Sequence, residues 1–143
     1  MKLINKYLYY LLGVIVGLNM SFTISNENDV WKVLNAMIQV ESKGNDSAYC
    51  AVEKAVGCLQ IRPIMVKEIN RIFIRQKKSI RYTLEDRWSR KKSIEMFFIW
   101  KNYHHKNSSL EKIARNWNGG PNGYTRNCTK VYWNKVKKEL ENG

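Results

Sequence analysis

The sequence predicts a single, mostly helical domain, and three observations support this fold class. Apolar residues between positions 27 and 140 recur at three- and four-residue spacing, which places them on one face of successive helices. No alternation of apolar and polar residues is long enough to predict a strand, and no repeat or linker divides the chain. With 143 residues, 44% of them hydrophobic, the chain has the size and composition of one globular domain.

The first predicted helix covers residues 27–42 and carries Glu41 on its apolar face, in phase with Leu34 and Met37. Partial burial and the negative end of the helix dipole both disfavour a charged carboxylate there, so they raise its pKa. A carboxyl group that is protonated near neutral pH can act as a general acid. Taken alone, Glu41 has an alternative as a boundary residue that reaches into water, since Gly44 suits a helix C-cap.

Four further helices are predicted from start signals and periodicity. Pro63 suits the first position of the second helix. Either Asp86 or Ser89 is expected to begin the third helix. Ser108 and Glu111 form a capping box for the fourth. These helices are expected over residues 64–74, 86–105 or 89–105, 110–117 and 129–140.

Four short motifs begin at Glu41: ESKGNDSA at 41–48, GCLQI at 57–61, ARNWNGGPNG at 114–123 and TKVYWNKV at 129–136. In this order and spacing they resemble the lytic transglycosylase family of the lysozyme-like fold. That family has Glu-Ser-x-x-Asn-Pro-x-Ala, Gly-Leu-Met-Gln-Ile, Ala-Tyr-Asn-x-Gly and a last helix with a Tyr. The resemblance covers residues 27–141 and implies a compact lysozyme-like domain, all-α or α+β but mostly helical, with a glycan-binding groove.

The resemblance implies that Glu41 is the catalytic acid and base. It implies substrate-binding roles at Ser42, Gln60, Trp117, Asn118 and Tyr132. Trp117 stands where the family usually has a Tyr, and an indole N–H can donate a hydrogen bond but cannot accept one. Tyr82 and Tyr124 are further candidates for the walls of a sugar groove, with ordinary packing as their alternative. The sequence departs from the family pattern at Asp46, Cys58 and Trp117.

The implied reaction cleaves the β-1,4 bond between N-acetylmuramic acid and N-acetylglucosamine in peptidoglycan. In the family, one Glu protonates the glycosidic oxygen and then removes the C6 hydroxyl proton, which leaves a 1,6-anhydro end. A hydrolytic lysozyme is the alternative enzyme, and it needs a second carboxylate. The candidates for that group are Asp46, Glu53, Glu85 and Asp86. A non-catalytic basic protein that binds cell wall or nucleic acid is the alternative outside enzymes.

Residues 1–25 are predicted to be an export segment. Lys2 and Lys6 precede the apolar run YLYYLLGVIVGL at 7–18, which has the length of a signal-peptide core. This run is shorter than the roughly 20 apolar residues of a transmembrane helix. An uncleaved membrane anchor, and hence membrane association through this segment, is the alternative. The expected organisation is therefore an export segment at 1–25 and a transglycosylase domain at 26–143, located in the periplasm or otherwise outside the cytoplasm.

The net charge of +13 attracts polyanions, which include cell wall, anionic lipid and nucleic acid. Charge does not choose among these partners, but the motifs favour glycan strands of peptidoglycan. We therefore expect no nucleic acid partner and a monomeric domain.

Neither a metal nor a cofactor is expected. The sequence has no Cys-x-x-Cys and no phosphate-binding loop, and the adjacent His104 and His105 are expected on different faces of a helix. Cys50, Cys58 and Cys128 allow two interpretations. One is a Cys50–Cys58 disulfide with one thiol left over, and the other is buried free thiols.

Overall fold

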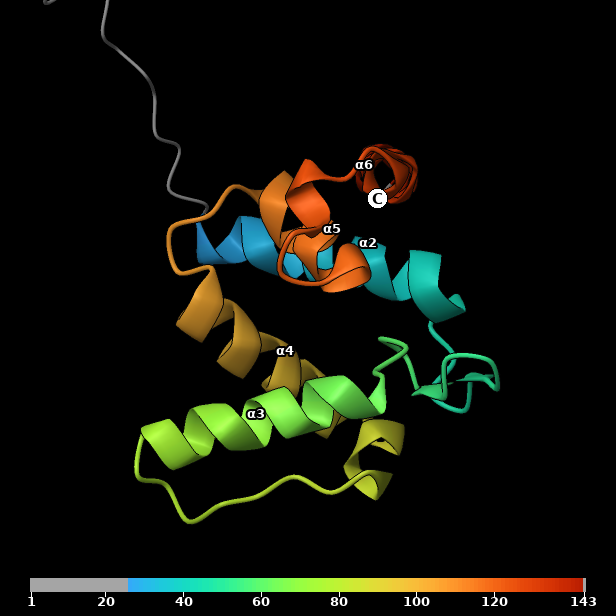
Figure 1. Ribbon diagram of the computed structural model, residues 1–143. Coiled ribbons are helices and arrows are strands. Elements are labelled where there is room, and N and C mark those ends of the chain that lie inside the picture. Colours follow the sequence, from blue (N-terminus) through green and yellow to red (C-terminus); the bar gives the residue numbers. More distant parts are fainter. Residues whose placement is uncertain (1–25, 143) are drawn as a thin grey trace, which may run out of the picture.

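The computed structural model describes residues 26–142, which form five α-helices, two short 3-10 helices and one two-stranded sheet (Figure 1). The α-helices are α2 (Glu27–Ser42), α3 (Pro63–Arg75), α4 (Arg90–His104), α5 (Leu110–Gly119) and α6 (Cys128–Asn142). The prediction of a mostly helical domain is confirmed. The predicted export segment lies outside the described residues. Within the described part of the chain, no helix combines the length and hydropathy needed to cross a membrane.

Two of the predicted helix starts are confirmed. Pro63 is the first residue of α3. The Ser89 hydroxyl caps α4 by accepting a hydrogen bond from the backbone N–H of Lys92. Asp86, the alternative cap, instead accepts from the backbone N–H of Thr83 and forms an ion pair with Lys92. It therefore holds the turn before α4 and the first turn of α4 together.

The predicted cap of α5 is wrong by one residue. Ser109, not Ser108, accepts the hydrogen bond from the backbone N–H of Lys112. Ser109 has the extended backbone that a capping residue needs, and the Ser108 hydroxyl lies 3.2 Å from Nδ1 of His105. Both serines are residue types that favour an N-cap, but only Ser108 has a Glu three residues later, and that spacing misplaced the cap by one residue.

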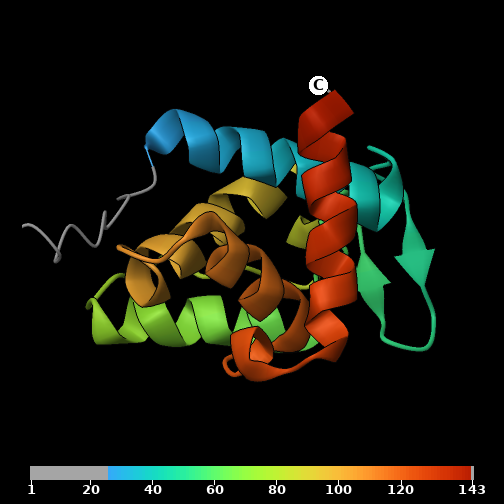
Figure 2. The same cartoon turned by 90° about the horizontal axis from the view of Figure 1, so that it is seen from above.

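A small antiparallel hairpin, β1 (Tyr49–Cys50) and β2 (Ala55–Val56), was not predicted (Figure 2). Strands of two residues are too short to show an alternating pattern. The hairpin is fixed by Gly57, whose backbone N–H donates to the Ala48 carbonyl at a φ of +78°. A Cβ at Gly57 would lie 2.2 Å from the Arg87 carbonyl oxygen, so only glycine allows this approach.

The helices form two layers whose side chains share one core. α3 packs on α4, and α2 packs on α5 and α6 (Figure 1). Fully buried residues come from both layers, including Leu34, Met37, Phe97, Ile69 and Ile113. The α5 and α6 helices are joined by the buried Arg115, whose Nε donates to the Thr129 hydroxyl at 2.9 Å. This core fixes the end of α2, where Glu41 lies.

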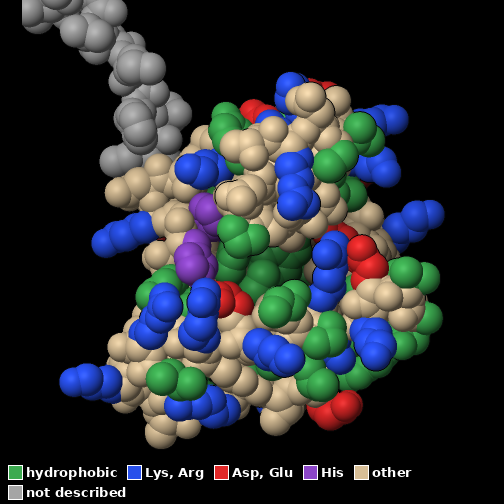
Figure 3. All heavy atoms as spheres, viewed as in Figure 1, with side chains coloured by type: hydrophobic (Ala, Val, Ile, Leu, Met, Phe, Trp, Pro, Cys, Tyr) green, Lys and Arg blue, Asp and Glu red, His purple; other side chains and the backbone are tan. Residues whose placement is uncertain are grey.

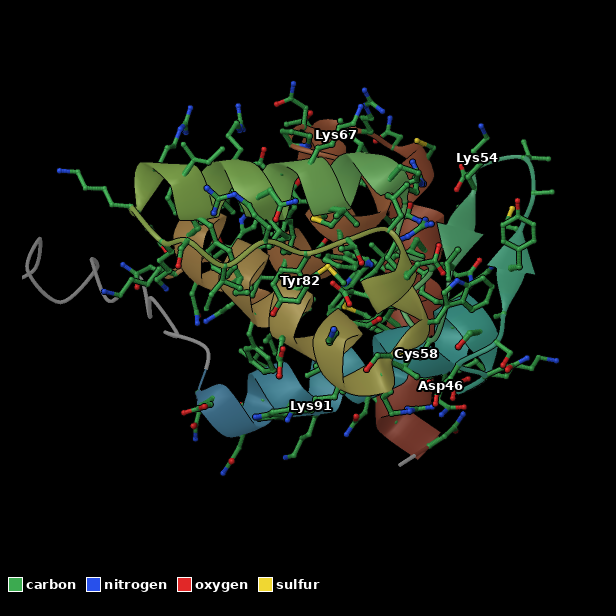
Figure 4. All side chains as sticks on the ribbon, turned by 90° about the horizontal axis from the view of Figure 1, so that it is seen from below. Asp46, Lys54, Cys58, Lys67, Tyr82 and Lys91 are labelled. Carbon is green, nitrogen blue, oxygen red and sulfur yellow. The ribbon has the colours of Figure 1, made fainter. Side chains whose placement is uncertain are left out.

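Tyr82 packs between α3 and α4, as Figure 4 shows, and does not reach the cavity described below. Its ring stacks on Phe73 with 5.9 Å between centroids, and its hydroxyl donates to Glu95 at 2.9 Å. Tyr124 is exposed, and its ring lies 4.8 Å from the Arg115 guanidinium. Packing, the alternative to a groove wall, therefore accounts for Tyr82, and Tyr124 does not line the cavity either.

All three cysteines are free thiols. Cys58 is buried in the core, Cys50 is half-buried and Cys128 is exposed. The structure thus has no Cys50–Cys58 disulfide, and the alternative of buried free thiols holds for Cys58 alone. Cys58 lies beside Asp46 below the end of α2 (Figure 4), and burial is the main cause that raises the pKa of its thiol.

Candidate active site

A cavity of about 590 Å³ lies where the two helical layers meet. Figure 3 shows it as a hollow with hydrophobic side chains at its floor, histidines at one side and acidic and basic groups at the other. Four of the predicted site residues line it, and they come from three separate parts of the chain: Glu41, Gln60, Trp117 and Asn118. The fold therefore brings together residues that are up to 77 positions apart in the sequence.

Glu41 lies in the last turn of α2, where it is half-buried and lines the cavity. Burial raises the pKa of its carboxyl group from 4.5 to about 7. Tyr132 and Arg62 lower this pKa, and the negative charge of Glu53 raises it. Near neutral pH, both the protonated and the ionised form of Glu41 are thus populated. A group that first donates and then accepts a proton needs both forms.

Tyr132 of α6 lies behind Glu41 and does not line the cavity. Burial and the Glu41 charge raise the pKa of its phenol well above the usual range, so it is a neutral donor. Its buried oxygen makes no hydrogen bond of normal geometry to any residue in 26–142, although the hydroxyl is close enough to lower the pKa of Glu41.

Ser42 was predicted to bind substrate, but it does not line the cavity. Its hydroxyl lies 2.9 Å from the Cys58 carbonyl oxygen, across the loop that leads to Gln60. Ser42 therefore fixes the second motif against the end of α2. Its place in the structure is that of a positioning residue.

Gln60 lines the cavity and also braces the hairpin. Its Nε2 donates to the carbonyl oxygens of Ala48 at 3.2 Å and Gly57 at 3.0 Å. Its backbone has a φ of +46°, in the left-handed region that residues other than glycine rarely adopt. Such strained positions concentrate at functional sites, where the surrounding structure enforces them.

Trp117 and Asn118 end α5 at the cavity wall. The Trp117 ring meets Phe97 and Trp100 edge to face, with centroids 5.3 and 5.2 Å apart. Trp117 therefore presents a rigid aromatic surface to the cavity. The tyrosine hydroxyl that lowers the pKa of Glu41 comes from Tyr132 of α6, not from the α5 position that Trp117 occupies.

Glu53 is the one carboxylate among the four predicted alternatives that lines the cavity. It forms an ion pair with Arg62 at 2.9 Å, and both side chains are about half exposed, at 49% and 44%. Asp46 is paired with Arg90, and Asp86 with Lys92, away from the cavity. Arg62 also donates to the Asn118 carbonyl at 3.5 Å, so it links the hairpin to the end of α5.

Sequence reasoning missed the other end of the cavity, where α3, α4 and α5 contribute charged and imidazole side chains: Glu68, Arg71, His104, His105 and Lys112. The only sequence signal is the three-residue spacing of Glu68 and Arg71, which suits an ion pair on a helix. The approach of α4 and α5 is a tertiary contact that no local pattern predicts.

Within residues 26–142, no group of three or more His, Cys, Asp or Glu side chains is arranged to hold a metal ion. In comparisons with protein-family models, curated proteins and solved structures, nothing matches this chain. The assignment of function therefore depends on the motifs and on the geometry of the cavity.

Proposed function

We propose that this protein is a lytic transglycosylase that cleaves the glycan strands of peptidoglycan, with Glu41 as its only acid and base. The observation that carries the proposal is the position of Glu41: a carboxyl group with a pKa of about 7 that lines a cavity to which three of the four motifs contribute. Tyr132 in the fourth motif acts on this carboxyl group from behind.

In the proposed reaction, protonated Glu41 gives its proton to the glycosidic oxygen as the bond from that oxygen to C1 of N-acetylmuramic acid breaks. The acetamido group of the same sugar stabilises the positive charge at C1. The Glu41 carboxylate then takes the proton of the C6 hydroxyl, and the C6 oxygen bonds to C1. The proton is back on Glu41, and the product ends in a 1,6-anhydro sugar without consuming water.

Other residues, both in the cavity and behind it, support this sequence of steps. Tyr132 is a neutral donor that stabilises the carboxylate formed between the two proton transfers. Trp117 offers an aromatic surface for the apolar face of a sugar ring, and Asn118 offers an amide group for its polar substituents. Gln60, whose amide nitrogen is bonded to the hairpin, offers its amide oxygen. Ser42 holds the end of α2 in place.

The lysozyme-like fold is part of the same proposal. The arrangement that supports it is a helix that ends at the acid, followed by a small hairpin beside the cavity and by further helices that close it. We also propose that the protein acts outside the cytoplasm, where its substrate is found, as a monomer.

Hydrolysis is the second candidate, and Glu53 is the observation that favours it. Glu53 lines the same cavity and is held by Arg62, so it offers the second carboxylate that a glycosidase needs to activate water or to attack C1. The Glu53 charge is already paired with Arg62, and this ion pair holds the hairpin in place. We therefore prefer the mechanism with one carboxylate.

The test is the release of soluble muropeptides from purified peptidoglycan by the wild-type protein and by Glu41→Gln and Glu53→Gln variants. We expect Glu41→Gln to lose activity by about 10²- to 10⁴-fold, the range for a general acid and base. We expect Glu53→Gln to stay within a few-fold of wild type. Equal loss in both variants would support the hydrolase, and inactive wild-type protein that still co-sediments with cell wall would support the non-catalytic binding protein.

A further inference from the structure

The cavity extends well beyond Glu41 along one face of α3. Ile64, Met65, Glu68 and Arg71 all line it at helical spacing. At 1.5 Å per residue, this face is about 10 Å long. We call its far part the distal end, and it is formed by Glu68, Arg71, His104, His105 and Lys112. A glycan strand that is bound at Glu41 and places a sugar ring against this face of α3 therefore extends toward the distal end.

The distal end has an organised set of charges. The Glu68 carboxylate lies 2.7 Å from Nε2 of His104 and forms an ion pair with Arg71. Partial burial opposes ionisation of Glu68, but hydrogen bonds from Arg71 and His104 prevail and lower its pKa. Glu68 is therefore ionised, and its carboxylate is already bound by Arg71 and His104. Lys112 takes part in no ion pair among the described residues, so its positive charge remains available at the cavity.

His105 gives the distal end a neutral polar group. It is only 7% exposed, and burial, followed by the charges of His104, Lys112 and Lys101, lowers its pKa to about 4. Its ring packs 4.6 Å from the Trp100 ring, and Nδ1 lies 3.2 Å from the Ser108 hydroxyl. Because Nδ1 faces Ser108, Nε2 is the ring nitrogen left to meet a ligand in the cavity.

We infer that the distal end is a subsite for a carboxylate carried by the substrate, with Lys112 as its ionic partner and His105 as its hydrogen-bond partner. This inference rests on the proposed function. Lys112 also lies in the first turn of α5, where the positive end of the helix dipole adds to the attraction. In a peptidoglycan strand the carboxylate belongs either to the stem peptide or, where no peptide is attached, to the lactyl group of muramic acid.

The two sources are distinguished by measuring kcat and KM on soluble strands with intact stem peptides and on strands from which an amidase has removed the peptides. We expect Lys112→Gln to raise KM about tenfold with little change in kcat, because one charge-assisted hydrogen bond to the substrate is lost. An effect on intact strands alone identifies the stem peptide, and an effect on peptide-free strands alone identifies the lactyl carboxylate. An effect on both substrates means that the subsite accepts either carboxylate. The increase should shrink in high salt.

Lys67→Gln is the matched control. Lys67 is an exposed lysine of α3 that does not line the cavity, and Figure 4 shows it on the outer side of that helix. Its replacement removes the same charge, and we expect less than a twofold change in KM. An equal effect of both variants would mean that net charge, not a subsite, attracts the strand. Unchanged KM for Lys112→Gln on both substrates would also overturn the inference.

Binding separates this inference from the proposed function. Calorimetry with the Glu41→Gln protein, with and without Lys112→Gln, reports affinity in the absence of cleavage. We expect Lys112→Gln to weaken binding of carboxylate-bearing strands and to leave binding of an uncharged chito-oligosaccharide unchanged. If the wild-type protein cleaves no strand but this difference in affinity is found, the proposed function fails and the subsite stands.

Discussion

The Tyr132 hydroxyl of α6 is directed at the Glu41 carboxyl of α2, and it is a buried donor with no other hydrogen-bond partner among residues 26–142. The first and the last helix of the described domain, α2 and α6, thus bring these two side chains together. Burial raises the pKa of Glu41, and the Tyr132 hydroxyl limits that rise. The pKa of Glu41, and with it the fraction of Glu41 that is protonated at neutral pH, therefore depends on the packing of α6 against α2.

Replacement of Tyr132 by Phe should raise the pKa of Glu41 above its present value of about 7, because a group that stabilises the carboxylate is lost. The alkaline limb of kcat/KM against pH should move to higher pH. Carbon-13 NMR titration of labelled Glu41 should show the same direction. Since the hydroxyl has no other partner, stability should change by less than about 1 kcal/mol. A lower pKa, or none of these shifts, would contradict the role given to Tyr132.

Glu41 should lower the stability of the fold as pH rises. Its folded pKa is raised from 4.5 to about 7, so the folded state binds this proton more tightly than the unfolded state does. The resulting stability is present below pH 4.5 and is lost as pH rises toward 7, at about 3 kcal/mol in total. Urea unfolding should therefore show Glu41→Gln to be more stable than wild type at pH 8 and equal to it at pH 4. Equal stability of the two proteins at both pH values would be evidence against a buried acid.

Local signals in the sequence predicted the helices and much of the cavity. Pro63, Ser89 and the apolar face that ends at Glu41 each depend on neighbours within one or two turns, and the structure follows them. The motifs indicated Gln60 and Asn118, which both line the cavity. These positions are predictable because their signal lies within a few residues.

What the sequence did not disclose depends on contacts between distant segments. Ser42 is adjacent to the acid but turns to the Cys58 carbonyl, and this direction is set by a loop 16 residues away. The distal end needs α3, α4 and α5 to meet before His105 and Lys112 share a cavity. Arg87 begins a basic stretch at residues 87–92, a pattern that usually indicates a solvated surface, yet only 7% of Arg87 is exposed. In each case, tertiary packing overrides the local pattern.

Arg87 should be required for the hairpin. Its guanidinium donates to the carbonyl oxygens of Lys54 and Leu84 at 2.7 Å and of Ile61 at 3.0 Å. Arg87→Met would remove these three hydrogen bonds, although the Ile61 carbonyl keeps the bond from the backbone N–H of Val56, and should cost about 2 to 4 kcal/mol of stability.

Chemical denaturation measures this loss, and Lys91→Met is the control, because Lys91 is an exposed cation on α4. We expect the control to stay within about 0.5 kcal/mol of wild type. Equal stability of both variants would show that Arg87 does not hold the hairpin.

The three thiols should differ in reactivity in the native protein. An aromatic disulfide reagent should modify the exposed Cys128 first and the half-buried Cys50 more slowly. Cys58 should react only on unfolding, because burial excludes the reagent and raises the thiol pKa. Three reactive thiols are expected in denaturant without reductant. A single reactive thiol there would reveal a disulfide and contradict this structure.

The central claim is that Glu41 serves as acid and then as base with no attack by water. The most direct measurement is mass spectrometry of muropeptides that the wild-type protein releases from peptidoglycan in ¹⁸O-enriched water. We predict 1,6-anhydro ends without ¹⁸O, and no such products from Glu41→Gln. Reducing ends that carry one ¹⁸O atom would contradict the account and establish hydrolysis, with Glu53 as the second carboxylate to test.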